Sequence, residues 1–110
     1  MSSLITDNLD AIRALGREYG VVRLEVFGSV CTDEFDPGTS DIDFLVEYPA
    51  GYDFGPWHAN FHALRRALTN VLNHPVDLVD TWALRDPRFS TEAAKTRQVL
   101  YDASHIAQTA

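Results

Sequence analysis

The chain has 110 residues, is 45% hydrophobic and 23% charged, and carries a formal net charge of −7 at pH 7. These proportions predict one folded globular domain over residues 1–110, and the acidic balance argues against binding of nucleic acid through clustered lysine and arginine. The single cysteine, Cys31, excludes a disulfide framework. Without a long apolar run or a signal-peptide pattern, the sequence predicts a soluble cytoplasmic protein with no membrane span.

The first half of the chain is predicted to form a helix followed by two strands. Apolar residues at helical spacing predict a helix over residues 4–19. Alternation of apolar and polar residues then predicts a strand over 21–27. A turn-rich loop over 29–40 leads to a second strand over 41–48, and a loop this short fits an antiparallel pair.

The second half is predicted to add a helix, a strand and a last helix. An apolar stripe predicts a helix over residues 56–72, and a short apolar strand follows over 76–80. A last helical stretch is expected within 87–102. The order α-β-β-α-β-α predicts an α/β (α+β) fold in which helices pack against a small mixed sheet.

Two aspartates at the start of the second strand form an unusual pair. Asp41 and Asp43 are two residues apart, so their carboxylates project from the same face of a strand. Two like charges on one face repel each other, and a half-buried strand normally has a β-branched apolar residue at such a position. A divalent cation removes the conflict, because Mg²⁺ prefers oxygen ligands and is commonly bound by one or two carboxylates plus substrate phosphates.

A third aspartate and a glycine–serine pair complete the candidate site. Asp77 is an acid inside an otherwise apolar strand, and it can join Asp41 and Asp43 if the third strand lies beside the second. Three carboxylates suit a site with two metal ions. Gly28 would let a phosphate approach the backbone at the end of the first strand, and Ser29 offers a hydroxyl and an N–H as donors.

Three segments together resemble a known family. They are 27–29 (Phe-Gly-Ser), 40–46 (Ser-Asp-Ile-Asp-Phe-Leu-Val) and 76–79 (Val-Asp-Leu-Val). They resemble the minimal nucleotidyltransferases of the DNA polymerase β superfamily. Residues 26–48 are similar to the MNT-domain antitoxins, which are encoded beside HEPN-domain toxins.

This resemblance implies a nucleotidyltransferase (polymerase β-like) fold and a role for each candidate residue. Asp41, Asp43 and Asp77 would be the catalytic metal ligands, with Asp77 as the base, and Gly28 and Ser29 would contact the nucleotide phosphates. Family members use ATP with Mg²⁺, and some transfer AMP to a tyrosine of the partner toxin. The resemblance therefore implies an enzyme with ATP as substrate, two Mg²⁺ ions and a HEPN toxin as partner.

One segment departs from the family pattern and leaves an alternative open. The loop after Ser29 reads Val-Cys-Thr-Asp-Glu-Phe-Asp over 30–36, with three acids where the family often has an arginine. Fewer cations mean weaker stabilisation of phosphates. The alternative is a catalytically impaired module of the same fold that neutralises its toxin by binding only. A homodimeric domain acting on another substrate is a third reading.

Other side chains have two readings each. Some cations either lie in solvent on helix faces or supply the phosphate contact absent from the loop: Arg65, Arg66, Lys95 and Arg97. Aromatic residues near a Pro/Gly loop either pack in the core or form a stacking or partner-binding surface: Tyr48, Tyr52, Phe54 and Trp57. His58 and His62 have a spacing that suits a metal but no evident third ligand, so we expect them at the surface.

Overall fold

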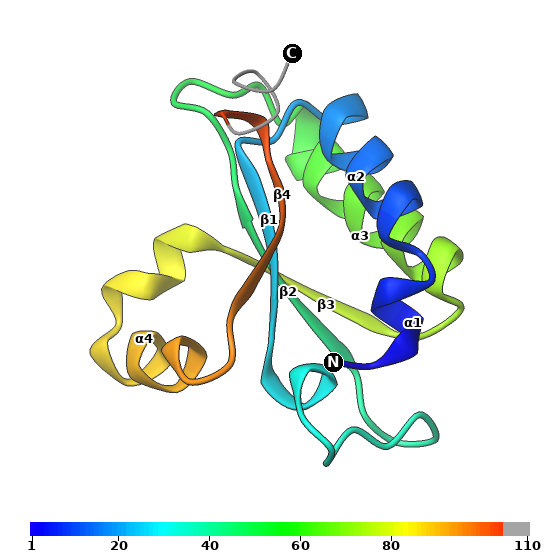
Figure 1. Cartoon of the computed structure of the whole chain (residues 1–110). Coiled ribbons are helices and arrows are strands. Elements are labelled where there is room, and N and C mark those ends of the chain that lie inside the picture. The colour runs from blue at the N-terminus through cyan, green and yellow to red at the C-terminus, as the bar shows by residue number, and fades with distance from the viewer. Residues whose placement is uncertain (105–110) are drawn as a thin grey trace.

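The structure is a computed structural model that describes residues 1–104, and its centre is a four-stranded mixed sheet (Figure 1). The strands are β1 (Arg23–Phe27), β2 (Ile42–Glu47), β3 (Val76–Asp80) and β4 (Gln98–Asp102). Their order in the sheet is β3-β2-β1-β4. β1 pairs antiparallel with both β2 and β4, whereas β3 runs parallel to β2. The predicted fold class, a small mixed sheet with helices packed against it, is confirmed.

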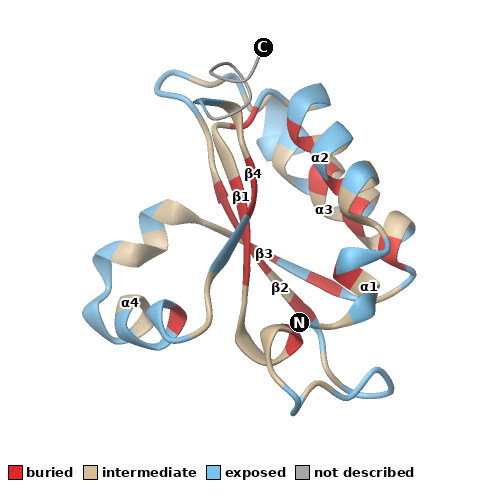
Figure 2. Ribbon diagram, in the orientation of Figure 1, coloured by how far each residue is buried: buried red, intermediate tan, exposed pale blue. Residues whose placement is uncertain are grey.

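The helices lie on both faces of this sheet (Figure 1). The longer ones are α2 (Leu9–Glu18) and α3 (Ala59–Leu72), and with the short α1 (Ser3–Thr6) they cover one face. The remaining helix, α4 (Pro87–Ala94), lies on the other side. Figure 2 shows that the buried residues follow the strands and the inward sides of α2 and α3.

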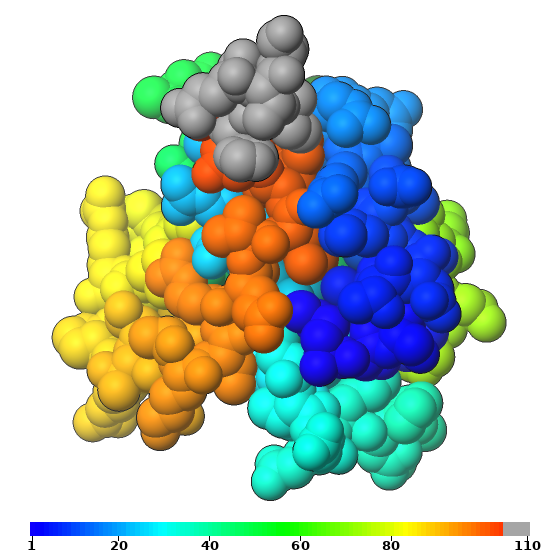
Figure 3. All heavy atoms as spheres, in the orientation of Figure 1, coloured from blue at the N-terminus to red at the C-terminus, as the bar shows by residue number. Residues whose placement is uncertain are grey.

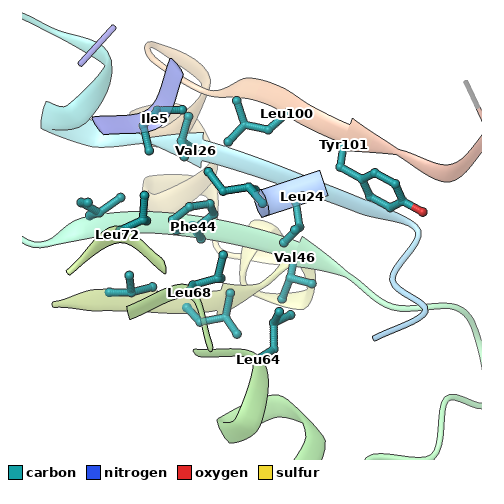
Figure 4. Packing of buried hydrophobic residues seen from close by; sticks show 14 of the residues in the cluster. Ile5, Leu24, Val26, Phe44, Val46, Leu64, Leu68, Leu72, Leu100 and Tyr101 are labelled. Atoms are coloured by element: carbon teal, nitrogen blue, oxygen red, sulfur yellow. The ribbon is translucent and has the colours of Figure 1, made fainter. Parts of the chain in front are cut away.

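The core lies between the sheet and the helices α1, α2 and α3 (Figure 4). The strand side chains that alternate toward this face are fully buried, as are the leucines of α3 that recur every four residues. Among these residues are Leu24, Val26, Phe44, Val46, Leu64 and Leu68. The apolar face of the sheet therefore anchors β1 and β2, and their polar residues are held on the opposite face.

The predicted first helix is two helices. The prediction of one helix over residues 4–19 is wrong at Asp7 and Asn8, where α1 ends and α2 begins. The side-chain amide of Asn8 donates to the carbonyl of Leu4 at 2.8 Å, and Ser2 caps the start of α1. Such side-chain hydrogen bonds compete with the helical ladder, so the break has a local cause.

The last helix expected within 87–102 is α4, which ends at Ala94, and the residues after it form β4, a strand that the sequence did not predict. In the pairing with β1, Tyr101 lies opposite Leu24 and Val99 lies opposite Glu25, so Leu100 is an extra, bulged residue. Both Leu100 and Tyr101 are buried. A bulge removes the regular alternation by which a strand is recognised in a sequence. The order of helices and strands is therefore α-α-β-β-α-β-α-β rather than α-β-β-α-β-α.

The predicted second helix starts later than residue 56. Pro56–His58 form a 3₁₀ turn, and Trp57 and His58 have φ values of 57° and 55°, so the α-helix begins at Ala59. Two adjacent left-handed residues cannot belong to an α-helix. Within residues 1–104, no helix has the length and apolar character needed to cross a membrane.

Candidate active site

The candidate site lies where β1, β2 and β3 run side by side. Asp43 lies opposite Phe27 of β1 and opposite Asp77 of β3 in the sheet register. The third strand thus does lie beside the second, with Asp77 as the direct neighbour of Asp43. Asp41 precedes β2 by one residue. All three acids therefore lie at one end of the β2–β3 pair.

Burial and the neighbouring acids shift the titration of Asp43. Burial, and after it the negative charges of Asp77 and Asp41, together raise the pKa of Asp43 from 3.8 to about 6. Asp43 is half-buried, whereas Asp41 and Asp77 are exposed. The site therefore concentrates negative charge on a partly desolvated carboxylate, which a bound cation would stabilise.

A pH dependence of stability follows from this shift. The folded-state pKa of Asp43 lies above its ordinary value of 3.8. Its contribution to the free energy of unfolding is therefore largest below that value and is lost as the pH rises through about 6. In metal-free buffer, we expect Asp43→Asn to become progressively more stable than the wild type across this window. Urea denaturation from pH 3.5 to 8 measures the difference, and a pH-independent difference would contradict it.

The side chains do not form a ready coordination shell. Within residues 1–104, no three His, Cys, Asp or Glu side chains lie together in an arrangement that could hold one ion. The donor set is nevertheless the one that Mg²⁺ uses, because this ion commonly takes one or two carboxylates and completes its shell with water and substrate phosphates. Ligation by Asp41, Asp43 and Asp77 therefore stays a prediction, with Asp43 and Asp77 as its best-placed pair.

Gly28 lies directly against the carboxylate of Asp43. Its φ is +79°, and a Cβ added there would come within 2.6 Å of Asp43 Oδ2. Its N–H donates to Thr96 Oγ1 at 2.7 Å. The backbone of Gly28 is thus held between Thr96 and Asp43, in a conformation and at a distance that a side chain would not permit.

This close approach predicts a strong effect of Gly28→Ala. The left-handed backbone costs an alanine about 1–2 kcal/mol, and its methyl group would in addition displace Asp43. Gly51→Ala is the matched control, since Gly51 has φ +75° but has nothing within 4 Å of an added Cβ. Chemical denaturation should show a larger decrease in the free energy of unfolding for Gly28→Ala than for Gly51→Ala. Equal losses for the two variants would mean that contact with Asp43 is unimportant.

Ser29 begins the loop that connects β1 to β2. It lies in the 3₁₀ turn Gly28–Cys31, and its carbonyl accepts from both the N–H and the hydroxyl of Thr32 at 2.9 Å. Its hydroxyl has no hydrogen-bond partner within the described part of the chain. The structure therefore brings Gly28, Asp43 and Asp77 together, and places Ser29 next to Gly28 with its hydroxyl uncommitted.

The rest of this loop is held by its own hydrogen bonds and by His74. Asp36 accepts from the N–H of Gly38 at 2.9 Å. Nε2 of His74 lies 3.1 Å from the carbonyl oxygen of Pro37, which ties the loop to the turn before β3. Asp33 and Glu34 are exposed. Solvent therefore screens the acids that the sequence places after Ser29.

Two of the four cations considered for the phosphates, Arg97 and Lys95, are engaged elsewhere. Arg97 donates to both oxygens of Glu25, at 2.9 and 2.7 Å, and Lys95 pairs with Glu92 at 3.0 Å. These hydrogen bonds raise the pKa of Arg97. Glu25 is only 3% exposed, although its position in an alternating strand suggests a solvent-facing residue. Sequence analysis missed Glu25 and Thr96, because their partners lie about 70 residues away.

The aromatic residues near the Pro/Gly loop divide between the two readings. Tyr48 packs with Tyr52 and Phe54 at ring-centroid distances of 4.5 and 4.7 Å. Trp57, in contrast, is 93% exposed. His58 is exposed and stacks on Phe54. Most of this group therefore packs together around Tyr48, which follows the end of β2, whereas Asp43 lies near the start of that strand.

Comparison with known proteins identifies the fold. A solved structure of a protein assigned as a minimal nucleotidyltransferase is 29% identical, over 86% of this chain and 90% of that chain, with a TM-score of 0.69. A chain of a toxin–antitoxin structure with AMP-PNP is 23% identical, over 93% and 79%, with a TM-score of 0.66. A chain of the tri-AMPylated Shewanella oneidensis HEPN toxin in complex with MNT antitoxin is 21% identical, over 94% and 77%, with a TM-score of 0.61. No curated protein matches the chain.

A family model matches most of the sequence. It is described as a nucleotidyltransferase domain, and its match spans residues 10–104. This range includes all four strands and every residue of the candidate site. The polymerase β-like resemblance and the observed sheet therefore agree, and the chain belongs to the nucleotidyltransferase domain family.

Proposed function

We propose that the chain is an antitoxin that transfers AMP from ATP to a hydroxyl of a HEPN-type toxin, with a tyrosine as the acceptor. One observation carries the proposal most directly. Asp43 lies next to Asp77 on the neighbouring strand and against the backbone of Gly28, so two carboxylates and the Gly28–Ser29 turn share one place. This is the arrangement that nucleotidyl transfer requires.

Each residue has a distinct role in the proposed reaction. Asp41, Asp43 and Asp77 would hold two Mg²⁺ ions, which neutralise the triphosphate and favour ionisation of the acceptor hydroxyl. The hydroxyl of Ser29 would donate to the phosphates beside Gly28. Asp77, which is exposed, would accept the proton of the acceptor hydroxyl. The acceptor oxygen bonds to the α-phosphorus, the bond to the bridging oxygen of the β-phosphate breaks, and pyrophosphate leaves.

Two features favour a protein as the acceptor. The acids that flank Asp43 are exposed, so a side chain presented on a protein surface can reach them. The structures that share the fold include toxin–antitoxin assemblies, among them one with a tri-AMPylated HEPN toxin. A HEPN toxin is therefore the partner that we propose, in the cytoplasm, with ATP as the nucleotide.

The binding-only alternative has its own support. The loop after Ser29 presents Asp33 and Glu34 to solvent and contains no cation. Arg97, the half-buried neighbour of Thr96, is committed to Glu25. A site with so little positive charge of its own depends on metal ions to hold a triphosphate. If it does not bind them, the chain would neutralise its toxin by contact alone.

One experiment separates the two proposals. The protein is incubated with the HEPN toxin encoded beside it, ATP and Mg²⁺, and the products are analysed by intact-mass spectrometry. We expect an AMP-sized increment on the toxin that disappears when EDTA removes the metal. A toxin that stays unmodified but still binds tightly would overturn the transferase proposal and support inhibition by contact.

A further inference from the structure

We infer that Thr96 is a positioning residue for the nucleotide site, because its hydroxyl fixes the Gly28–Ser29 turn against Asp43. The inference rests on the proposed function for the identity of the ligand. Thr96 lies between α4 and β4, far from the aspartates in sequence. Neither the family resemblance nor the spacing of the acidic residues points to it.

The central contact joins two distant parts of the chain. The N–H of Gly28 donates to Thr96 Oγ1 at 2.7 Å, across 68 residues of sequence. Figure 3 shows the segment that follows α4 (orange) next to the start of the β1–β2 loop (cyan) on one face of the molecule. An N–H to hydroxyl bond of this length is short. It fixes the direction of the Gly28 backbone at the point where β1 ends.

The segment that carries Thr96 is itself well anchored. The N–H groups of Thr96 and Arg97 both donate to the carbonyl of Ala93, at 3.1 and 2.9 Å, which ties them to the last turn of α4. Arg97 also binds both oxygens of Glu25, three residues before Gly28 on β1. Thr96 therefore acts on Gly28 from a fixed point rather than from a loose loop.

The other side of Gly28 explains why its position matters. An added Cβ would lie 2.6 Å from Asp43 Oδ2, so no free space separates this backbone from the carboxylate. A small shift of the turn changes where the hydroxyl of Ser29 lies relative to Asp43. Without the Thr96 hydroxyl, Gly28 loses its hydrogen-bond acceptor and the turn can move, while the aspartates themselves remain unchanged.

The test uses variants of Thr96 with a matched control. Thr96→Val removes the hydroxyl at nearly constant volume, and Thr96→Ser restores it. Thr91→Val is the control, because Thr91 is an exposed threonine of α4 whose hydroxyl binds only the carbonyl of Pro87. Two quantities are measured: hydrogen exchange of the Gly28 amide, and the Kd and KM for ATP with Mg²⁺.

We expect Thr96→Val to speed exchange of the Gly28 amide and to raise the Kd and KM for ATP about tenfold, with a much smaller change in kcat. Thr96→Ser should restore both readouts to within about threefold of the wild type, and Thr91→Val should change neither. If Thr96→Val does not fold, Thr96→Ala removes the same hydroxyl without adding a methyl group in its place.

Each outcome has a definite meaning. Unchanged Gly28 exchange, or unchanged ATP affinity, in Thr96→Val would overturn the inference. A serine variant as defective as the valine variant would also overturn it, because the methyl group and not the hydroxyl would then matter. If the wild type does not bind ATP, the proposed function fails, and amide exchange still decides whether Thr96 holds the turn.

Discussion

Asp43→Asn should lower the rate of AMP transfer about a thousandfold or more while the domain stays folded. Asp43 is the central acid of the site, next to Asp77 in the sheet and against Gly28. As a metal ligand in the proposed reaction, Asp43 would contribute several kcal/mol of transition-state stabilisation, and about 4 kcal/mol corresponds to that factor. Intact-mass analysis of the toxin over time measures the rate.

The control for this prediction is Asp10→Asn. Asp10 is an exposed acid of α2, a helix on the other face of the sheet, so its substitution makes the same change in charge away from the site. It should leave the transfer rate unchanged. The account would be contradicted if Asp43→Asn kept full activity, or if both variants lost activity equally, since net charge would then be the cause.

Arg97→Met should destabilise the fold by about 3–5 kcal/mol. The substitution leaves the carboxylate of Glu25 without its cation, and Glu25 is only 3% exposed in the middle of β1, an inner strand of the sheet. Breaking a buried ion pair by removing one partner typically costs this much, because an uncompensated charge stays buried. The free energy of unfolding from urea denaturation measures the loss.

Two further variants test the cause. The double variant Glu25→Met/Arg97→Met should recover most of the lost stability, because it removes both charges. Lys95 lies two residues before Arg97 and forms an exposed ion pair with Glu92. Lys95→Met removes this pair and should cost less than about 1 kcal/mol. Equal losses for Lys95→Met and Arg97→Met would show that the burial of Glu25 does not matter.

Much of the site could be predicted from local sequence. The spacing of Asp41 and Asp43 predicts carboxylates on one face of a strand, because side chains alternate along any strand, and in the structure β2 begins between them at Ile42. Asp77 stands out because it lies between Val76 and Leu78. Its position opposite Asp43 depends on parallel pairing of β2 and β3. That register comes from the whole sheet and not from either segment alone.

The features that local patterns missed depend on distant contacts. β4 is hidden by its bulge at Leu100, since periodicity fails where an extra residue enters the ladder. In the sequence, Glu25 looks like an ordinary polar strand residue, and only the fold shows that Arg97 pairs with its carboxylate. No local sequence pattern marks Thr96, and only the fold brings its hydroxyl to the N–H of Gly28. Local sequence therefore indicated the candidate acids, whereas the residues that hold the Gly28 turn became evident only from the fold.

The measurement that tests the account most directly is anomalous diffraction from crystals grown with Mn²⁺ and a non-hydrolysable ATP analogue. We predict anomalous density between Asp43 and Asp77, with Asp41 as a further ligand and the analogue's phosphates beside Gly28 and Ser29. Nucleotide bound elsewhere, or no metal at these carboxylates, would contradict the central claim that this corner of the sheet performs nucleotidyl transfer.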